Sequence, residues 1–176
     1  MKNKDCVLSK EEKDELANLY NYYYNHELIQ KMKEIPMHRG SNCFIHSFKV
    51  AKLAIKKALR RKKKLDYKSI LLASILHDYY LYDWRKDKSL LKNHATNHPT
   101  LASNNAKEDF AINDDVSKII LSHMWPYNFK VFPKSIEARI VLVADKNVAT
   151  IEALSFKASK ERRIEKTIKK IENLFD

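Results

Sequence analysis

Hydrophobic residues recur at intervals of three and four along most of the chain, a spacing that predicts helices. Ser9 and Glu12 have the spacing of a capping box at the start of the first one. Alternation with a period of two, which would predict strands, is essentially absent. We expect two helices within residues 9–34, a polar loop at 85–97, and further helices over 42–62, 67–80, 99–110, 114–125, 135–148 and 156–175. The sequence therefore predicts an all-α, single-domain fold of about seven to eight helices.

Composition narrows this prediction. The chain has 176 residues, enough for one ordinary domain with its own core. A single glycine argues against β-sandwiches and barrels, which need many tight turns, and against glycine-rich phosphate loops. The two cysteines are too few for a disulfide framework or a four-cysteine zinc site. They favour a reducing compartment, so we expect a cytoplasmic protein.

The net charge alone does not identify a binding partner. The formal net charge is +12, a balance that can mark a phosphate-bearing partner. A solvated, lysine-rich surface explains this charge better, so a nucleic-acid partner is possible but not favoured. The longest apolar stretches are too short to span a bilayer, and we expect no membrane partner. The sequence makes no prediction of oligomeric state.

Several histidines and an aspartate stand where a helical core should be apolar. His46 has Val50 and Leu53 on its own helical face, and His77 ends the most apolar helix of the chain. His123 and Asp145 also share a face with aliphatic residues. A buried, unpaired carboxylate costs several kcal/mol, on the order of 2–7 for a neutral polar group and more for a charge. A shared cation explains these inward groups together, and imidazole with carboxylate suits Mn, Fe, Ni, Co or Zn.

Three short motifs carry a family resemblance. They are His46-Ser47-x-x-Val50-Ala51, Ile75-Leu76-His77-Asp78 and Val143-Ala144-Asp145-Lys146. In this order they resemble the HD-domain superfamily of metal-dependent phosphohydrolases, and the resemblance covers roughly residues 38–152. It implies a helical HD-domain fold in which His46, His77, Asp78 and Asp145 bind one divalent ion.

Two further motifs resemble a subgroup of small bacterial HD proteins. They are His94-x-x-x-His98-Pro99 and His123-Met124-Trp125-Pro126. HD proteins with two such extra histidines bind a second ion, which implies His98 and His123 as its ligands and Asp78 as the bridge. The order of ligands also resembles HD-GYP phosphodiesterases, but the GYP segment is missing, so a cyclic-dinucleotide substrate is not supported.

The resemblance implies that a metal-activated water attacks phosphorus, and it directs attention to nearby polar residues. Asp78 would hold both ions, and Lys146 and Arg39 are candidate phosphate contacts. His94 is a candidate substrate contact. Glu152 lies seven residues after Asp145 on the same helical face, where it would accept a hydrogen bond from a ligand or pair with a cation. We expect a small phosphorylated substrate, with nucleotides and phosphodiesters among the candidates.

Two alternatives stay open at this point. Some HD-fold proteins with the same six ligands are diiron oxygenases, and the sequence separates these poorly from hydrolases. The other alternative is a non-catalytic basic module that binds nucleic acid through its lysines and holds metals only for structure. Iron-dependent O₂ consumption would favour the first, and steeply salt-dependent nucleic-acid binding would favour the second.

Overall fold

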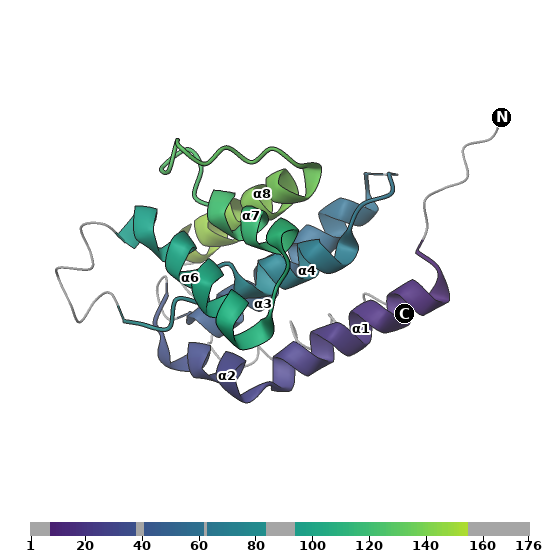
Figure 1. Cartoon of the computed structure of the whole chain (residues 1–176), viewed down its shortest axis with the longest axis horizontal. Coiled ribbons are helices and arrows are strands. Elements are labelled where there is room, and N and C mark those ends of the chain that lie inside the picture. The colour runs from purple at the N-terminus through teal and green to yellow at the C-terminus, as the bar shows by residue number, and fades with distance from the viewer. Residues whose placement is uncertain (1–7, 38–40, 62, 84–93, 155–176) are drawn as a thin grey trace.

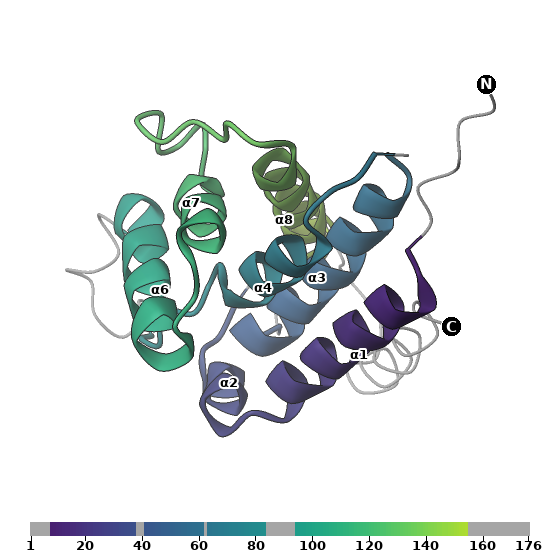
Figure 2. The ribbon, with the colours of Figure 1, turned by 45° about the vertical axis from the view of Figure 1, so that its right-hand side comes forward.

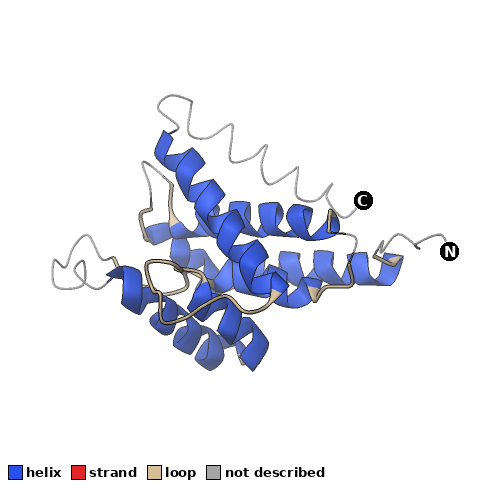
Figure 3. Ribbon diagram, turned by 90° about the horizontal axis from the view of Figure 1, so that it is seen from above, coloured by secondary structure: helices blue, strands red, loops and turns tan. Residues whose placement is uncertain are grey.

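The computed structural model describes residues 8–37, 41–61, 63–83 and 94–154. These residues form seven α-helices and one 3₁₀ helix, with no strand among them, which confirms the all-α prediction (Figure 1, Figure 3). An isolated bridge joins Pro36 to Asn42. The elements are α1 (Lys10–Asn25), α2 (Glu27–Gln30), η1 (Lys31–Glu34), α3 (Cys43–Leu59), α4 (Tyr67–Leu76), α6 (His94–Phe110), α7 (Asp114–Ser122) and α8 (Ile136–Leu154).

Side-chain caps fix where most of these helices begin. Ser9 and Glu12 form the expected capping box at α1, each side chain accepting from the other's backbone N–H. Asn42, Asp66 and Asn113 accept in the same way at the starts of α3, α4 and α7. Each cap satisfies a backbone donor that has no partner within its helix. The predicted starts of these helices are confirmed to within a residue.

Helices α3 and α4 form the centre of the molecule. Helix α3 packs against α4 on one side and α8 on another, while α4 also packs against α7 (Figure 2). Helix α1 lies along this central pair, where the Tyr20 ring meets the Phe48 ring edge to face at 5.2 Å. Nearly all of α4 is buried, from Tyr67 to Leu76. Polar side chains on the inner faces of α3 and α4 are therefore cut off from water.

Five predicted boundaries are wrong. Two of them are the end of α7, which lies at Ser122 rather than Trp125, and the end of α8, which lies at Leu154 rather than Val148. Residues 94–97, expected in a loop, belong to α6, so Pro99 is the sixth residue of that helix rather than the first. Helix α3 ends at Leu59, three residues before the predicted end at Lys62. Helix α4 ends at Leu76, not at Tyr80, and the chain continues through Leu81 at a φ of 55°. Asn105 on α6 donates to the carbonyl of Tyr79 at 3.1 Å and so replaces the lost helical partner.

The predicted helix over 156–175 lies outside the described residues, as do residues 85–93 of the predicted loop. Within the described part of the chain, no helix is both long enough and apolar enough to cross a lipid bilayer.

Candidate metal centre

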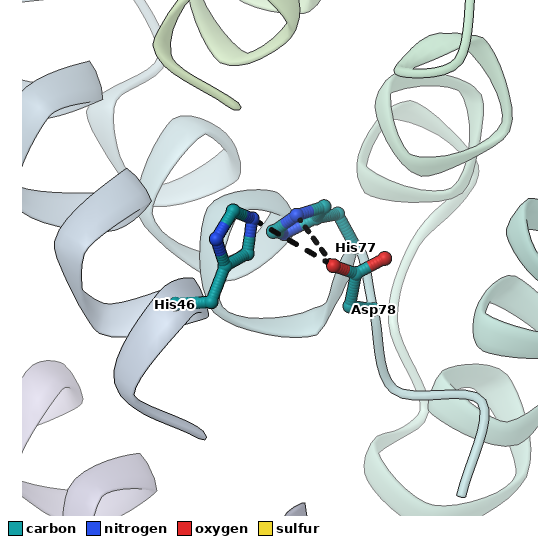
Figure 4. A group of neighbouring side chains, drawn as sticks. All are labelled: His46, His77 and Asp78. Atoms are coloured by element: carbon teal, nitrogen blue, oxygen red, sulfur yellow. Dashed lines mark ion pairs between the residues drawn. The ribbon is translucent and has the colours of Figure 1, made fainter. Parts of the chain in front are cut away.

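Six buried side chains from five helices meet at the centre of the molecule. Each is at most 6% exposed, although all six are polar or charged. They are His46 on α3, His77 and Asp78 at the end of α4, His98 on α6, His123 at the end of α7, and Asp145 on α8. The structure thus brings together all six residues that the sequence suggests as metal ligands. Figure 4 shows three of them, His46, His77 and Asp78, pointing toward one another.

One half of this cluster, which we call the α3–α8 half, contains His46, His77 and Asp145. His46 Nε2 lies 3.1 Å from Asp145 Oδ1 and 3.8 Å from Asp78 Oδ2. His77 Nε2 lies 3.1 Å from Asp78 Oδ2 and 3.7 Å from Asp145 Oδ1. Two imidazole nitrogens and two carboxylate oxygens therefore face a common point.

The other half, the α6–α7 half, contains His98 and His123. Their Nε2 atoms lie 3.3 Å and 3.8 Å from Asp78 Oδ1, and 2.9 Å from each other. Asp78 consequently turns one oxygen toward each half. A carboxylate placed in this way can bridge two cations.

The outer nitrogens of the four rings show which inner nitrogens carry lone pairs. The Nδ1 atoms of three rings lie within hydrogen-bond distance of backbone carbonyls, at 2.9 Å for His77, 2.8 Å for His98 and 2.7 Å for His123. His46 Nδ1 lies 2.9 Å from Glu152 Oε2. Carbonyl and carboxylate oxygens only accept, so each Nδ1 carries the proton and donates it. In the neutral rings, all four Nε2 lone pairs therefore converge on the cluster.

This convergence fits a bound cation. His77 Nε2 is buried and makes no hydrogen bond, and the Nε2 atoms of His98 and His123 face each other at 2.9 Å. Lone pairs and carboxylates that face one another repel unless positive charge lies between them. Three overlapping trios, each with ligand atoms within 4.8 Å of one another, could hold an ion: His46–His77–Asp78, His77–His123–Asp145 and Asp78–His98–His123. Nitrogen and oxygen donors with outer hydrogen-bond partners are the usual setting of a divalent metal.

Without a metal, protons take over part of this role in the α3–α8 half. Burial alone would lower the pKa of His46, but the hydrogen bonds to Asp145 and Glu152 outweigh it and raise the pKa to about 9. The carboxylates of Asp78 and Asp145 likewise outweigh burial and raise the pKa of His77 to about 10. Burial raises the carboxylate pKa values in turn, yet the facing histidines hold the pKa values of Asp78 and Asp145 well below their usual value.

His123 in the α6–α7 half, and His94 beside it, show the opposite shift in pKa. Burial, followed by the neighbouring charges of His98 and His77, lowers the pKa of His123 to about 3. Burial and His98 also lower the pKa of the nearby His94 to about 4. His123 and His94 therefore stay neutral at neutral pH and can offer lone pairs without first losing a proton.

The remaining predicted residues are placed unequally. Lys146 Nζ lies 3.1 Å from Asp145 Oδ2 and 5.8 Å from the centre of the Tyr127 ring, so it borders the cluster. His94 stacks on His98 at 4.6 Å between ring centres, and its Nδ1 lies 2.8 Å from the Tyr82 hydroxyl. Arg39 lies outside the described residues, and its phosphate contact stays a prediction.

Sequence reasoning missed two residues at the edge of the cluster. Ser41 and Lys49 both contact Glu152, which in turn contacts His46. Lys49 lies three residues after His46 and thus shares its helical face, a signal that the abundance of lysine obscured.

Comparison with known proteins agrees with this geometry. No curated protein and no solved structure matched the chain. The family model described as HD domain matches residues 43–149, more than half of the chain and a span that includes all six buried residues. The chain therefore belongs to the HD domain family, which is part of a superfamily of metal-dependent hydrolases.

Proposed function

We propose that the protein is a metal-dependent phosphohydrolase that cleaves a small phosphate ester, and that His46, His77, Asp78, His98, His123 and Asp145 hold two divalent ions. The observation that carries this proposal is the convergence of four imidazole lone pairs on two carboxylates in a buried cluster. Bound divalent ions supply Lewis acidity there, which polarises a phosphoryl oxygen and lowers the pKa of a water molecule.

The chain's own residues orient the reaction. Asp78 and Asp145 are buried and stay ionised, since their pKa values lie well below the usual range despite burial. The four histidines are held by their Nδ1 contacts, which fix each ring before any ligand arrives. Such a rigid cluster places charges in advance, and this preorganisation is what favours a transition state over a ground state.

Two residues at the rim contact the substrate in this proposal. Lys146 is about one third exposed and is anchored to Asp145, so its ammonium can bind a phosphate oxygen beside the cluster. His94 stays neutral at neutral pH because its pKa is lowered to about 4 by burial and by His98. With its Nδ1 beside the Tyr82 hydroxyl, it can donate or accept a hydrogen bond at a substrate oxygen.

A panel of substrates tests the proposal. Nucleotides, other phosphomonoesters and phosphodiesters are incubated with wild-type protein and Mn²⁺, Co²⁺, Ni²⁺ or Mg²⁺, and phosphate or alcohol release is measured beside elemental analysis. We expect release with at least one metal and none from the Asp78→Ala variant. Absence of release with every metal, together with O₂ consumption by the iron-loaded protein, would replace the hydrolase with the oxygenase alternative.

A further inference from the structure

Glu152 is a buried carboxylate that the proposed chemistry does not use. It lies in the last turns of α8, two turns after Asp145, and is 7% exposed. A buried carboxylate needs hydrogen-bond partners to offset its lost hydration. Its partners therefore indicate what it does in the folded protein.

Three donors from two other segments converge on this carboxylate. His46 Nδ1 lies 2.9 Å from Oε2, on the side of the ring that faces away from the cluster. Lys49 Nζ donates to Oε1 at 2.7 Å, and the Ser41 hydroxyl donates to the same oxygen at 3.0 Å. One oxygen thus holds the histidine, while Lys49 and Ser41 hold the other oxygen in place.

We propose that Glu152 is a positioning residue, which fixes the orientation and proton of His46 and thereby sets the metal affinity of the α3–α8 half. The role rests on the proposed metal-dependent function. Because a carboxylate only accepts, His46 must keep its proton on Nδ1 and present the Nε2 lone pair to the cluster. The negative charge also makes the ring a better electron donor to a cation.

The contrast with the other three rings makes this role specific to His46. His77, His98 and His123 are oriented by backbone carbonyls, which are neutral and belong to their own helices. Among these four rings, His46 is the one oriented by a charged side chain from a different helix. Its basicity therefore depends on a side chain, which makes that dependence accessible to mutation.

Helix α8 holds His46 from both sides. Asp145 faces Nε2 at 3.1 Å, and Glu152, on the same helical face, faces Nδ1 at 2.9 Å. Lys49 extends this contact because it leaves the same face of α3 as His46 and reaches the same carboxylate. The α3–α8 contact consequently fixes the ring and its charge partner as one unit.

Metal titration of purified variants tests the proposal. Mn²⁺ binding is measured by calorimetry for the wild type, Glu152→Gln, Glu152→Ala and Lys49→Met. Glu137→Gln serves as the matched control, since it makes the same chemical change at the other end of α8, where Glu137 contacts the backbone of Asp66. We expect Glu152→Ala to weaken binding by about 10- to 100-fold, Glu152→Gln to weaken it less, and Glu137→Gln to leave it unchanged.

Two further measurements separate positioning from a purely structural role. In the Zn²⁺-loaded wild type, proton NMR should show a slowly exchanging His46 Nδ1–H resonance, and Glu152→Ala should lose it. Lys49→Met should weaken Mn²⁺ binding in the wild-type background and have no further effect in Glu152→Ala, because its contact acts through that carboxylate.

The outcomes are distinguishable. If the wild type binds Mn²⁺ and Glu152→Ala binds it equally well, the positioning role is wrong while the metal centre stands. If the wild type binds no divalent metal, the proposed function fails and the positioning role fails with it. If Glu152→Ala lowers stability and leaves both the affinity and the NMR resonance intact, Glu152 is structural only.

Discussion

Both halves of the buried cluster contain histidines, but the pKa values of His46 and His77 in one half and of His123 in the other are shifted in opposite directions. In the α3–α8 half, carboxylates outweigh burial and raise the pKa values of His46 and His77 to about 9 and 10. In the α6–α7 half, burial dominates and lowers the pKa of His123 to about 3. The difference follows from the carboxylates within hydrogen-bond distance, because Asp145 lies 3.1 Å and Glu152 2.9 Å from His46, whereas His123 Nε2 lies 3.8 Å from Asp78 Oδ1.

This contrast predicts different behaviour toward cations. A metal that enters the α3–α8 half must displace protons from His46 and His77, and it gains two carboxylates in return. A metal that enters the α6–α7 half meets a neutral His123 ring, and the carboxylate nearest to both rings of this half is Asp78. We therefore expect tighter but more strongly pH-dependent binding in the first half and weaker binding in the second.

Loss of Asp78 should have the largest effect, since this residue faces both halves. Asp78→Ala should abolish divalent-metal binding and all hydrolysis, as measured by elemental analysis and phosphate release. Asp115→Ala, which removes an exposed aspartate from α7, is the control and should retain both. Retained activity of Asp78→Ala in a metal-depleted preparation would contradict the assignment of the cluster.

Removal of a ring from the α6–α7 half should separate the two halves. His98→Ala or His123→Ala should reduce the metal content from two ions toward one and leave the α3–α8 half loaded. Elemental analysis at saturating Mn²⁺ measures this ratio directly. A single ion in the saturated wild type would show that the two halves form one site.

The free energy of unfolding of the metal-free protein should fall on both sides of neutral pH. Below about pH 6.5, the unfolded chain binds a proton at His123, whereas in the folded protein this ring stays neutral down to about pH 3. Acid therefore destabilises the fold. His46 and His77 have the opposite sign, because their stabilisation is complete below about pH 6.5 and is lost as pH rises through about 9 and 10.

Urea unfolding at several pH values checks both limbs. We expect a loss of about 2 kcal/mol between about pH 7 and pH 5 from one such proton. His123→Gln should flatten the acid limb and leave the alkaline limb in place. An unchanged acid limb in that variant would mean that carboxylates such as Glu152, whose pKa is lowered to about 2 by His46 and Lys49 against the effect of burial, account for it.

Loss of Lys146, at the edge of the cluster, should have the smallest effect and should leave the metal content of both halves unchanged. Lys146→Met should raise KM about tenfold, which is near the contribution of one charge-assisted hydrogen bond, and leave metal content unchanged. Lys130→Met, an exposed lysine on the α7–α8 connection, is the control. A change in metal content in Lys146→Met would move Lys146 from substrate contact to support of Asp145.

The helical fold and the inward histidines could be predicted because periodicity reports burial. His46 and Asp145 share faces with aliphatic residues, and the structure buries both. The assignment of His98 as a ligand came from the family resemblance instead, because its neighbours in the sequence are mostly polar. The same polarity hid the first turn of α6, where Pro99 seemed better suited to the first helical position.

The outer contacts could not be predicted, because they depend on tertiary packing. Nothing in the sequence distinguishes Lys49 from the many other lysines, and its role appears once α8 brings Glu152 beside α3. The pKa contrast between His77 and His123 is hidden for the same reason. Both residues end an apolar helix, and the carboxylates that face each ring come from other parts of the chain.

The carbonyls that orient His77 and His123 belong to Ser74 and Ile120, each three residues earlier in the final turn of its own helix. The residues at which α4 and α7 end therefore set the directions in which the His77 and His123 rings point into the cluster. A one-residue insertion or deletion near either stop would swing a ring by about 100° around the helix axis, the rotation of one residue in a helix of 3.6 residues per turn. Changes of length at these two points should consequently be tolerated far less than changes of side chain.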